Sequence, residues 1–110
     1  MITEDYCSYE VAKLLEEKGF KEPVTKLNRL LFEEGKKPLL KITHQKAMKW
    51  LREVYKIYIV VSPISGKGYN AILCDVSDFD DFNYIGETDY FFHPEEAVEA
   101  GIKYCLENLI

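Results

Sequence analysis

The sequence has little of what marks an exported or membrane protein. Its three cysteines, Cys7, Cys74 and Cys105, are an odd number at scattered spacings, which fits neither a disulfide framework nor a Cys-x-x-Cys pair. Residues 1–5 are acidic where a signal peptide is basic, and no apolar run approaches the ~20 residues needed to span a bilayer. We therefore expect a soluble, cytoplasmic protein with reduced thiols and no membrane partner.

The sequence also lacks a catalytic, metal-binding or nucleotide-binding motif. The Gly-Lys-Gly segment at 66–68 is too short for a phosphate-binding loop and precedes no predicted helix, so it suits a hairpin connection. Cys74 or Cys105 with His44 or His93 would be the minimal set for a thiol nucleophile or a metal site. Both cysteines fall in predicted packed elements, where they behave as small apolar residues. We predict no catalytic residues, metal ligands or cofactor, and no enzyme activity.

Charge is distributed unevenly along the chain. The formal net charge of −5 disfavours bulk nucleic-acid binding. Residues 1–35 nevertheless carry 5 basic and 8 acidic side chains, residues 36–56 carry 7 and 1, and residues 57–110 carry 2 and 10. The basic middle and the acidic end could face each other within the fold or serve separate partners.

The clearest helix signal lies at the C-terminus, from Pro94 to the end of the chain. Pro94 suits the first helical position, and Glu95 and Glu96 place negative charge at the positive end of the helix dipole. An apolar stripe follows at helical spacing: Val98, Ile102, Cys105 and Leu109. The opposite side is charged: Glu95, Glu99, Lys103 and Glu107, with Glu99 and Lys103 at i,i+4. The small residues Ala97 and Gly101 predict close packing on a flat surface such as a sheet.

Two further helices are predicted in the first half of the chain. Ser8 is a suitable N-cap for a helix over 9–18, and Gly19 with Phe20 fits a Schellman ending over Leu15. Thr43 caps a helix over 44–55. Its expected buried face is Ala47, Met48, Leu51, Val54 and Tyr55. Residues 24–35 fit a short helix or an extended segment about equally, and residues 39–42 are predicted to be extended.

The sequence pattern of the second half of the chain predicts β-strands. Residues 57–61 are apolar on both alternating faces, which fits a strand covered on both sides, and residues 69–76 complete a hairpin. Residues 82–85 and 90–92 are expected to add short strands. A single α+β domain over 1–110 follows, with two layers: a small antiparallel meander of about three strands packed against the N-terminal helices and the C-terminal helix.

Three segments together resemble a known group of proteins. They are Ser-Tyr-Glu-Val-Ala-Lys-Leu-Leu-Glu-Glu-Lys-Gly-Phe at 8–20, Ala-Met-Lys-Trp-Leu-Arg-Glu-Val at 47–54 and Glu-Glu-Ala-Val-Glu-Ala-Gly-Ile-Lys-Tyr-Cys-Leu at 95–106. The order of these segments resembles small uncharacterised proteins encoded in prophages and mobile elements of Bacteroides-type gut bacteria, although residues 24–42 depart from their tyrosine-rich extended stretch. The resemblance implies a cytoplasmic, phage-associated protein, and it implies no activity or site residues.

The predicted helix over 44–55 carries the best candidate surface for nucleic acid. Its basic side chains and one aromatic are the ingredients for binding phosphates and stacking a base: Lys46, Lys49, Trp50, Arg52 and Lys56. From His44 onward the predicted order is that of a double-stranded-RNA-binding domain, whose last helix begins with lysines, whereas Pro-Glu-Glu at 94–96 would repel phosphates. The terminal Pro-Glu-Glu-Ala-x-Glu-Ala segment also resembles HicB-type antitoxins. The alternative is an ordinary solvated helix face, with Trp50 completing the edge of the core.

Aromatic and acidic residues of the second half offer a protein-binding surface instead. The candidate aromatics would crowd a small sheet and leave some rings exposed: Tyr58, Tyr69, Tyr84, Tyr90 and Phe92. The segment 75–81 contains four aspartates but lacks the register of a calcium-binding loop, so a solvated turn is expected. The leading prediction is a non-enzymatic module that binds protein or itself, and the alternative is a nucleic-acid-binding or antitoxin-like regulator.

Overall fold

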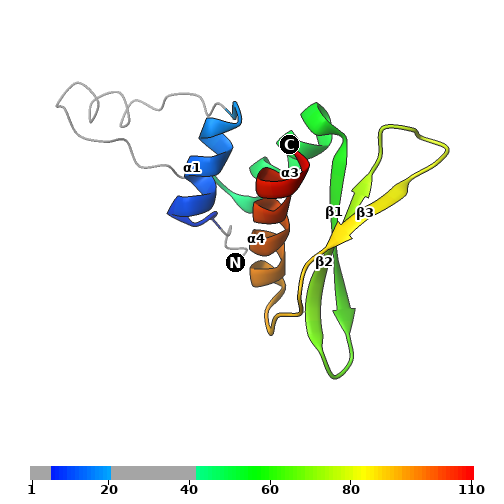
Figure 1. Cartoon of the computed structure of the whole chain (residues 1–110). Helices are drawn as coiled ribbons and strands as arrows, with labels where there is room; N and C mark the ends of the chain where they lie inside the picture. The colour runs from blue at the N-terminus through cyan, green and yellow to red at the C-terminus, as the bar shows by residue number, and fades with distance from the viewer. Residues whose placement is uncertain (1–5, 21–41) are drawn as a thin grey trace.

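Figure 1 shows the computed structural model, which describes residues 6–20 and 42–110. The elements, in chain order, are α1 (Tyr9–Glu17), α3 (His44–Tyr55), β1 (Ile57–Ile64), β2 (Gly68–Asp75), β3 (Asn83–Glu87) and α4 (Pro94–Tyr104), which continues as a π-helical turn over Cys105–Leu109. The strands form an antiparallel sheet in the order β1-β2-β3. The predicted α+β class and small meander are confirmed. Apart from Ile42, the predictions for residues 24–42 lie outside the described residues.

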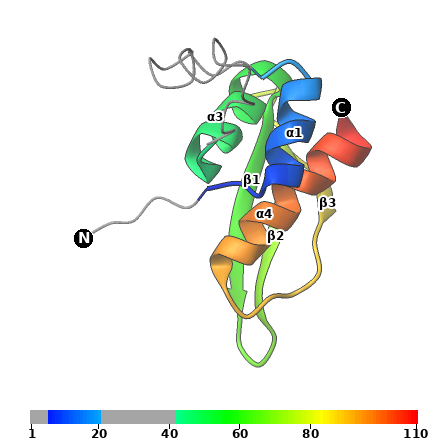
Figure 2. The same ribbon diagram turned by 90° about the vertical axis from the view of Figure 1, so that its left-hand side faces the viewer.

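All the described helices lie on one face of the sheet. α4 packs on β1 and β2, α3 contacts β1 and α4, and α1 packs against α4 as an outer layer (Figures 1 and 2). No described element covers the other face of the sheet. The prediction that residues 57–61 are covered on both sides is therefore wrong: Ile57 and Ile59 point to the helices and are buried, whereas Tyr58 and Val60 are 44% and 40% exposed.

The ends of α1 follow the sequence prediction closely. The Ser8 hydroxyl accepts a hydrogen bond from the Val11 N–H at 3.2 Å, which caps the first turn. At the other end Gly19 has a φ of +104°, and its N–H donates to the carbonyl of Glu16. The Phe20 N–H donates to the carbonyl of Leu15, which completes the predicted Schellman motif.

Gly19→Ala is expected to lower the free energy of unfolding by about 1 kcal/mol, because an L-residue is strained at this left-handed φ. Nothing lies within 4 Å of the added Cβ, so steric crowding does not contribute. Urea denaturation of the variant and the wild type measures the difference. Stability equal to the wild type would contradict the left-handed ending.

α4 begins as predicted, with Pro94 in the first turn and Glu95 and Glu96 following it. The predicted close packing on the sheet is also confirmed. Ala97 and Gly101 are buried, and a Cβ added at Gly101 would lie 2.9 Å from Ala71 Cβ and 3.3 Å from Ile59 Cγ2. The absence of a side chain at 101 is what lets α4 rest on β1 and β2.

Two predictions about side-chain placement are wrong. Val54 and Tyr55 were expected in the buried face of the second predicted helix, but they are 55% and 37% exposed. α3 packs mainly on β1 and α4, so only its narrow Ala47 and Leu51 side is fully covered. Glu99 was expected to face water beside Lys103, but its carboxylate instead contacts His44 at the start of α3. Lys103 pairs with Glu10 at 3.0 Å and with Glu107 at 3.7 Å.

The short strands differ in part from their predictions. The third strand spans Asn83–Glu87, slightly later than the predicted 82–85, and a register shift in its pairing lies between Leu73 and Cys74 of β2. Residues 90–92 form no strand: Phe91 makes an isolated bridge with Tyr69, whose two N–H···O distances are both 2.7 Å. This bridge connects the segment before α4 to the start of β2.

Candidate functional site

The uncovered side of the sheet carries a group of neighbouring apolar side chains, and the polar pair Ser62 and Asn70 separates Ile64 from the others. Cys74 lies in register with Tyr58 on one neighbouring strand and Tyr84 on the other, and Ile72 lies beside Val60 in the next row. Tyr84 is 62% exposed, and Cys74 and Ile72 are half-buried. We call this surface the open face and define it by Tyr58, Val60, Ile64, Ile72, Cys74 and Tyr84. Glu87 lies in register with Ile72 at the edge of the open face, and its exposed carboxylate places one negative charge beside these apolar side chains.

The acidic loop continues from one end of the open face. We define it as residues 75–82, from the last residue of β2 to the residue before β3, and it extends away from the sheet in Figure 1. Asp75 accepts a hydrogen bond from the Ser77 N–H at 2.9 Å, and hydrogen bonding to the Ser77 side chain, followed by this backbone bond, lowers the pKa of the Asp75 carboxyl. Phe79 is 87% exposed and meets Phe82 edge to face, with 6.4 Å between ring centroids. The loop therefore presents carboxylates and aromatic rings to solvent together.

The predicted interaction aromatics do not form one cluster. Tyr58 and Tyr84 lie on the open face, on either side of Cys74. Tyr69 is half-buried and packs against the core. The Tyr90 ring is covered by the Lys67 ammonium, 5.2 Å from its centroid, and Phe92 is 88% exposed beside the start of α4. Only the tyrosines at 58 and 84 share a surface with other exposed apolar residues.

The basic side of α3 is arranged differently from its prediction. The cationic side chains are exposed: Lys46, Lys49, Arg52 and Lys56. Trp50, however, packs edge to face between Phe20 and Tyr55, at centroid distances of 5.6 and 5.2 Å. The indole is half-buried in the rim of the core, so it offers less surface for stacking a base than the sequence implied.

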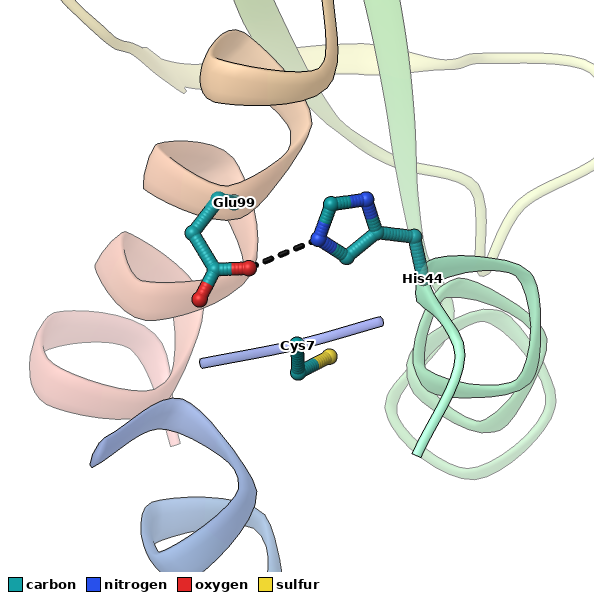
Figure 3. Close-up of side chains that lie close together, drawn as sticks. All are labelled: Cys7, His44 and Glu99. Atoms are coloured by element: carbon teal, nitrogen blue, oxygen red, sulfur yellow. Dashed lines mark hydrogen bonds and ion pairs between the residues drawn. The ribbon is translucent and has the colours of Figure 1, made fainter. Parts of the chain in front are cut away.

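A cluster of polar side chains connects the starts of α1 and α3 with the middle of α4. We call it the polar joint and define it by Cys7, Ser8, His44 and Glu99. Glu99 Oε2 lies 2.7 Å from His44 Nε2, and Glu99 Oε1 accepts a hydrogen bond from the Ser8 N–H at 2.8 Å. Ser8 is the N-cap of α1 and His44 is the first residue of α3, so the carboxylate lies at the positive ends of two helix dipoles. Figure 3 shows Cys7 beside the facing imidazole and carboxylate.

The joint changes the acidity of two of its members. Burial raises the pKa of the Glu99 carboxyl, but the hydrogen bonds from His44 and Ser8 outweigh that effect, and the pKa lies below its usual value. Burial, together with the negative charge of Glu99, raises the pKa of the Cys7 thiol to about 12. Without a counter-cation Cys7 is therefore a protonated thiol at neutral pH and a poor nucleophile.

Sequence reasoning missed this joint. Of the residues that it weighed for thiol or metal chemistry, Cys74 lies on the open face, Cys105 in the core and His93 exposed at the N-cap of α4. Only His44 belongs to the joint, and its partners are Glu99 and Cys7. The one available signal was that Ser8 and Thr43, two good N-caps, each stand next to a potential ligand residue.

An open hollow of about 540 Å³ lies next to the joint. It is lined by His44 and Glu99, by Tyr6 and Phe91, and by the exposed carboxylates at the start of α4, Glu95 and Glu96. The imidazole and the carboxylate of the joint can therefore be reached from solvent.

Comparisons with known proteins found no relative of this chain. No helix in the described ranges 6–20 and 42–110 has the length and apolar character to cross a bilayer. No family model, curated protein or solved structure matched the chain.

Proposed function

We propose that this protein is a non-enzymatic interaction module that binds a basic, partly apolar surface of a partner protein through its open face and its acidic loop. The open face is the observation that carries the proposal. Single exposed apolar side chains are normal on any protein, but several neighbouring apolar side chains on an uncovered sheet, with the Glu87 carboxylate at their edge, are typical of an interaction site. Tyr58 and Tyr84 supply the large aromatic contacts that dominate many interfaces.

The size of the open face indicates how far the interface extends. At usual strand spacings the sheet is about 14 Å wide and the stretch from Tyr58 to Ile64 about 20 Å long, which gives roughly 300 Å². A standard interface buries about 800 Å² on each partner. A partner must therefore reach past the sheet, and the acidic loop with Phe79 and Phe82 is the adjoining surface.

The negative charge of the second half of the chain favours a basic partner. Residues 57–110 contain 10 acidic and 2 basic side chains. Both cations are engaged, since Lys67 lies over the Tyr90 ring and Lys103 pairs with Glu10 and Glu107. A second copy paired through the same face would bring an equally acidic surface to the acidic loop, whereas a basic partner would gain from both the apolar and the charged contact.

The cellular setting belongs to the same proposal. We place the module in the cytoplasm, where the free thiols Cys7, Cys74 and Cys105 would stay reduced, and in a phage or mobile element on the strength of the sequence resemblance. Nucleic-acid binding through α3 is less favoured, because Trp50 packs between Phe20 and Tyr55 and α4 starts with Glu95 and Glu96.

A synthetic peptide of alternating leucine and lysine residues tests the proposal on the full chain. Titrated into ¹⁵N-labelled protein, it is expected to shift amide resonances of the strands and the acidic loop. The double variant Tyr58→Ser with Tyr84→Ser is expected to bind it about 30-fold more weakly, because interface aromatics often contribute ~1 kcal/mol each. Added salt is expected to weaken binding, and a leucine-glutamate peptide should not bind.

Tyr9→Ser provides the matched control, because Tyr9 is an exposed tyrosine on α1, on the helical side of the molecule. Equal affinity of the double variant and this control would overturn the proposal. A dimeric mass in sedimentation that the double variant abolishes would replace the basic partner with a second copy. Binding of an RNA duplex that Lys49→Glu with Arg52→Glu abolishes would move the function to α3.

A further inference from the structure

Cys7, His44 and Glu99 bring three kinds of metal-ligating atom together. One ligand atom of each residue, thiol sulfur, imidazole nitrogen and carboxylate oxygen, lies within 4.8 Å of the others. Cys7 comes from the segment before α1, His44 from the start of α3 and Glu99 from the middle of α4 (Figure 3). Among the described residues this is the one group with such an arrangement.

The backbone fixes these positions independently of any ion. The Cys7 N–H donates to the carbonyl of Ile42 at 2.8 Å, and Tyr6 bridges Thr43, so the segments before α1 and α3 run side by side. The Ser8 N–H holds Glu99 Oε1 and leaves Oε2 directed at His44. A hydrogen bond to the second oxygen of a carboxylate is the outer-shell support that metal ligands usually have.

We infer that Cys7 Sγ, His44 Nε2 and Glu99 Oε2 form a binding site for a zinc-class divalent ion. Thiolate, imidazole and carboxylate are all zinc ligands, and the sulfur disfavours magnesium and calcium. Tetrahedral bonding at about 2.0–2.3 Å separates neighbouring ligand atoms by about 3.3–3.6 Å. The His44 and Glu99 atoms, now 2.7 Å apart, must separate by less than about 1 Å to reach this spacing, and the Cys7 sulfur already lies within 4.8 Å of both.

The proton balance of binding follows from the same contacts. When the ion binds Nε2, the hydrogen that His44 shares with Glu99 leaves that nitrogen and the neutral imidazole carries its one N–H at Nδ1, while the Cys7 thiol releases its proton to solvent. Burial and the charge of Glu99 oppose ionisation of this thiol in the metal-free protein, and a bound cation supplies the missing positive charge.

The fourth coordination position faces the hollow. His44 and Glu99 line it, so water or a small ligand can complete the tetrahedron, as in zinc sites with three protein ligands. Glu95 lies one turn before Glu99 and lines the same hollow. This inference is independent of the proposed partner binding, which uses the opposite side of the sheet.

Cobalt provides the test, because Co²⁺ occupies zinc sites and reports a sulfur ligand by its charge-transfer absorption. Co²⁺ added to the full-length Cys74→Ser protein is expected to give a thiolate-to-cobalt band and tetrahedral visible bands, and Zn²⁺ should remove both. Replacement of the half-buried thiol at 74, on the open face, ensures that the band reports one of the two buried cysteines. Adding Cys7→Ser is expected to abolish the thiolate band and weaken Co²⁺ binding by about 100-fold.

Cys105→Ser in the same background is the control, since Cys105 is buried in the core and should leave the band unchanged. Circular dichroism establishes that each variant is folded. Co²⁺ binding without a thiolate band in the Cys74→Ser protein would overturn the inference even if Cys7→Ser did not fold. So would a band that survives Cys7→Ser, and so would no detectable binding of either ion.

Discussion

Gly101→Val is expected to lower the free energy of unfolding by about 3 kcal/mol, the largest effect of any single substitution considered for this fold. A Cβ at this position already lies 2.9 Å from Ala71 Cβ and 3.3 Å from Ile59 Cγ2, and the two γ-methyl groups of valine would add to the overlap. Valine improves helix propensity over glycine by only about 0.3 kcal/mol, so crowding dominates. Thermal denaturation should show the midpoint falling by more than about 10 °C.

Ala100→Val is the matched control for this experiment. It places the same side chain on the neighbouring residue of α4, at a half-buried position that borders the hollow. Its expected cost is only the helix-propensity difference of about 0.5 kcal/mol. Equal destabilisation by the two valines would mean that α4 does not rest on the sheet through Gly101.

The same glycine illustrates how much of the fold the sequence predicts. Glycine lowers helix propensity, so its presence at 101 beside an apolar stripe predicts that another part of the chain packs closely against the helix there. Ala71 does so. The caps at Ser8 and Thr43 and the Schellman ending at Gly19 are predictable for a similar reason. Each depends on residues within one or two turns, so the sequence itself contains both partners.

Features that depend on layer placement are not predictable in this way. Residues 57–61 are apolar on both faces, which matches a strand buried on both sides, but α1, α3 and α4 all pack on one side. The sequence cannot show that the outer side of the strand is uncovered, because apolar residues on that side fit a buried core and an exposed binding surface equally well. The positions of the helices, all on one side of the sheet, are what identify the open face as a candidate site.

The polar joint was hidden for a related reason. Glu99 follows the charged side of its helix, and Lys103 one turn later is a sufficient local partner. Its actual partners, Ser8 and His44, are 91 and 55 residues away. Helical periodicity gives the side of α4 on which Glu99 lies, but not that the N-termini of α1 and α3 meet there.

Glu99→Ala is expected to lower the free energy of unfolding by about 2–3 kcal/mol, measured in chelator so that no metal contributes. The substitution leaves the Ser8 N–H and His44 without their acceptor and removes the negative charge from two helix N-termini. Removing one partner of a fully buried ion pair costs about 3–5 kcal/mol. The Glu99 side chain is still 25% exposed, which places the expected loss below that range.

A double-mutant cycle with His44→Ala separates the pair from the rest of the joint. If the 2.7 Å contact stabilises the fold, the double variant should be more stable than the sum of the two losses predicts, by about 1 kcal/mol. Glu99→Gln keeps an acceptor for Ser8 and is expected to lose less than Glu99→Ala. Additive losses, or a glutamine variant as unstable as the alanine variant, would contradict a joint held by the carboxylate. The carboxylate matters because it lies where three segments of the chain meet, so its loss should loosen α1 and α3 together.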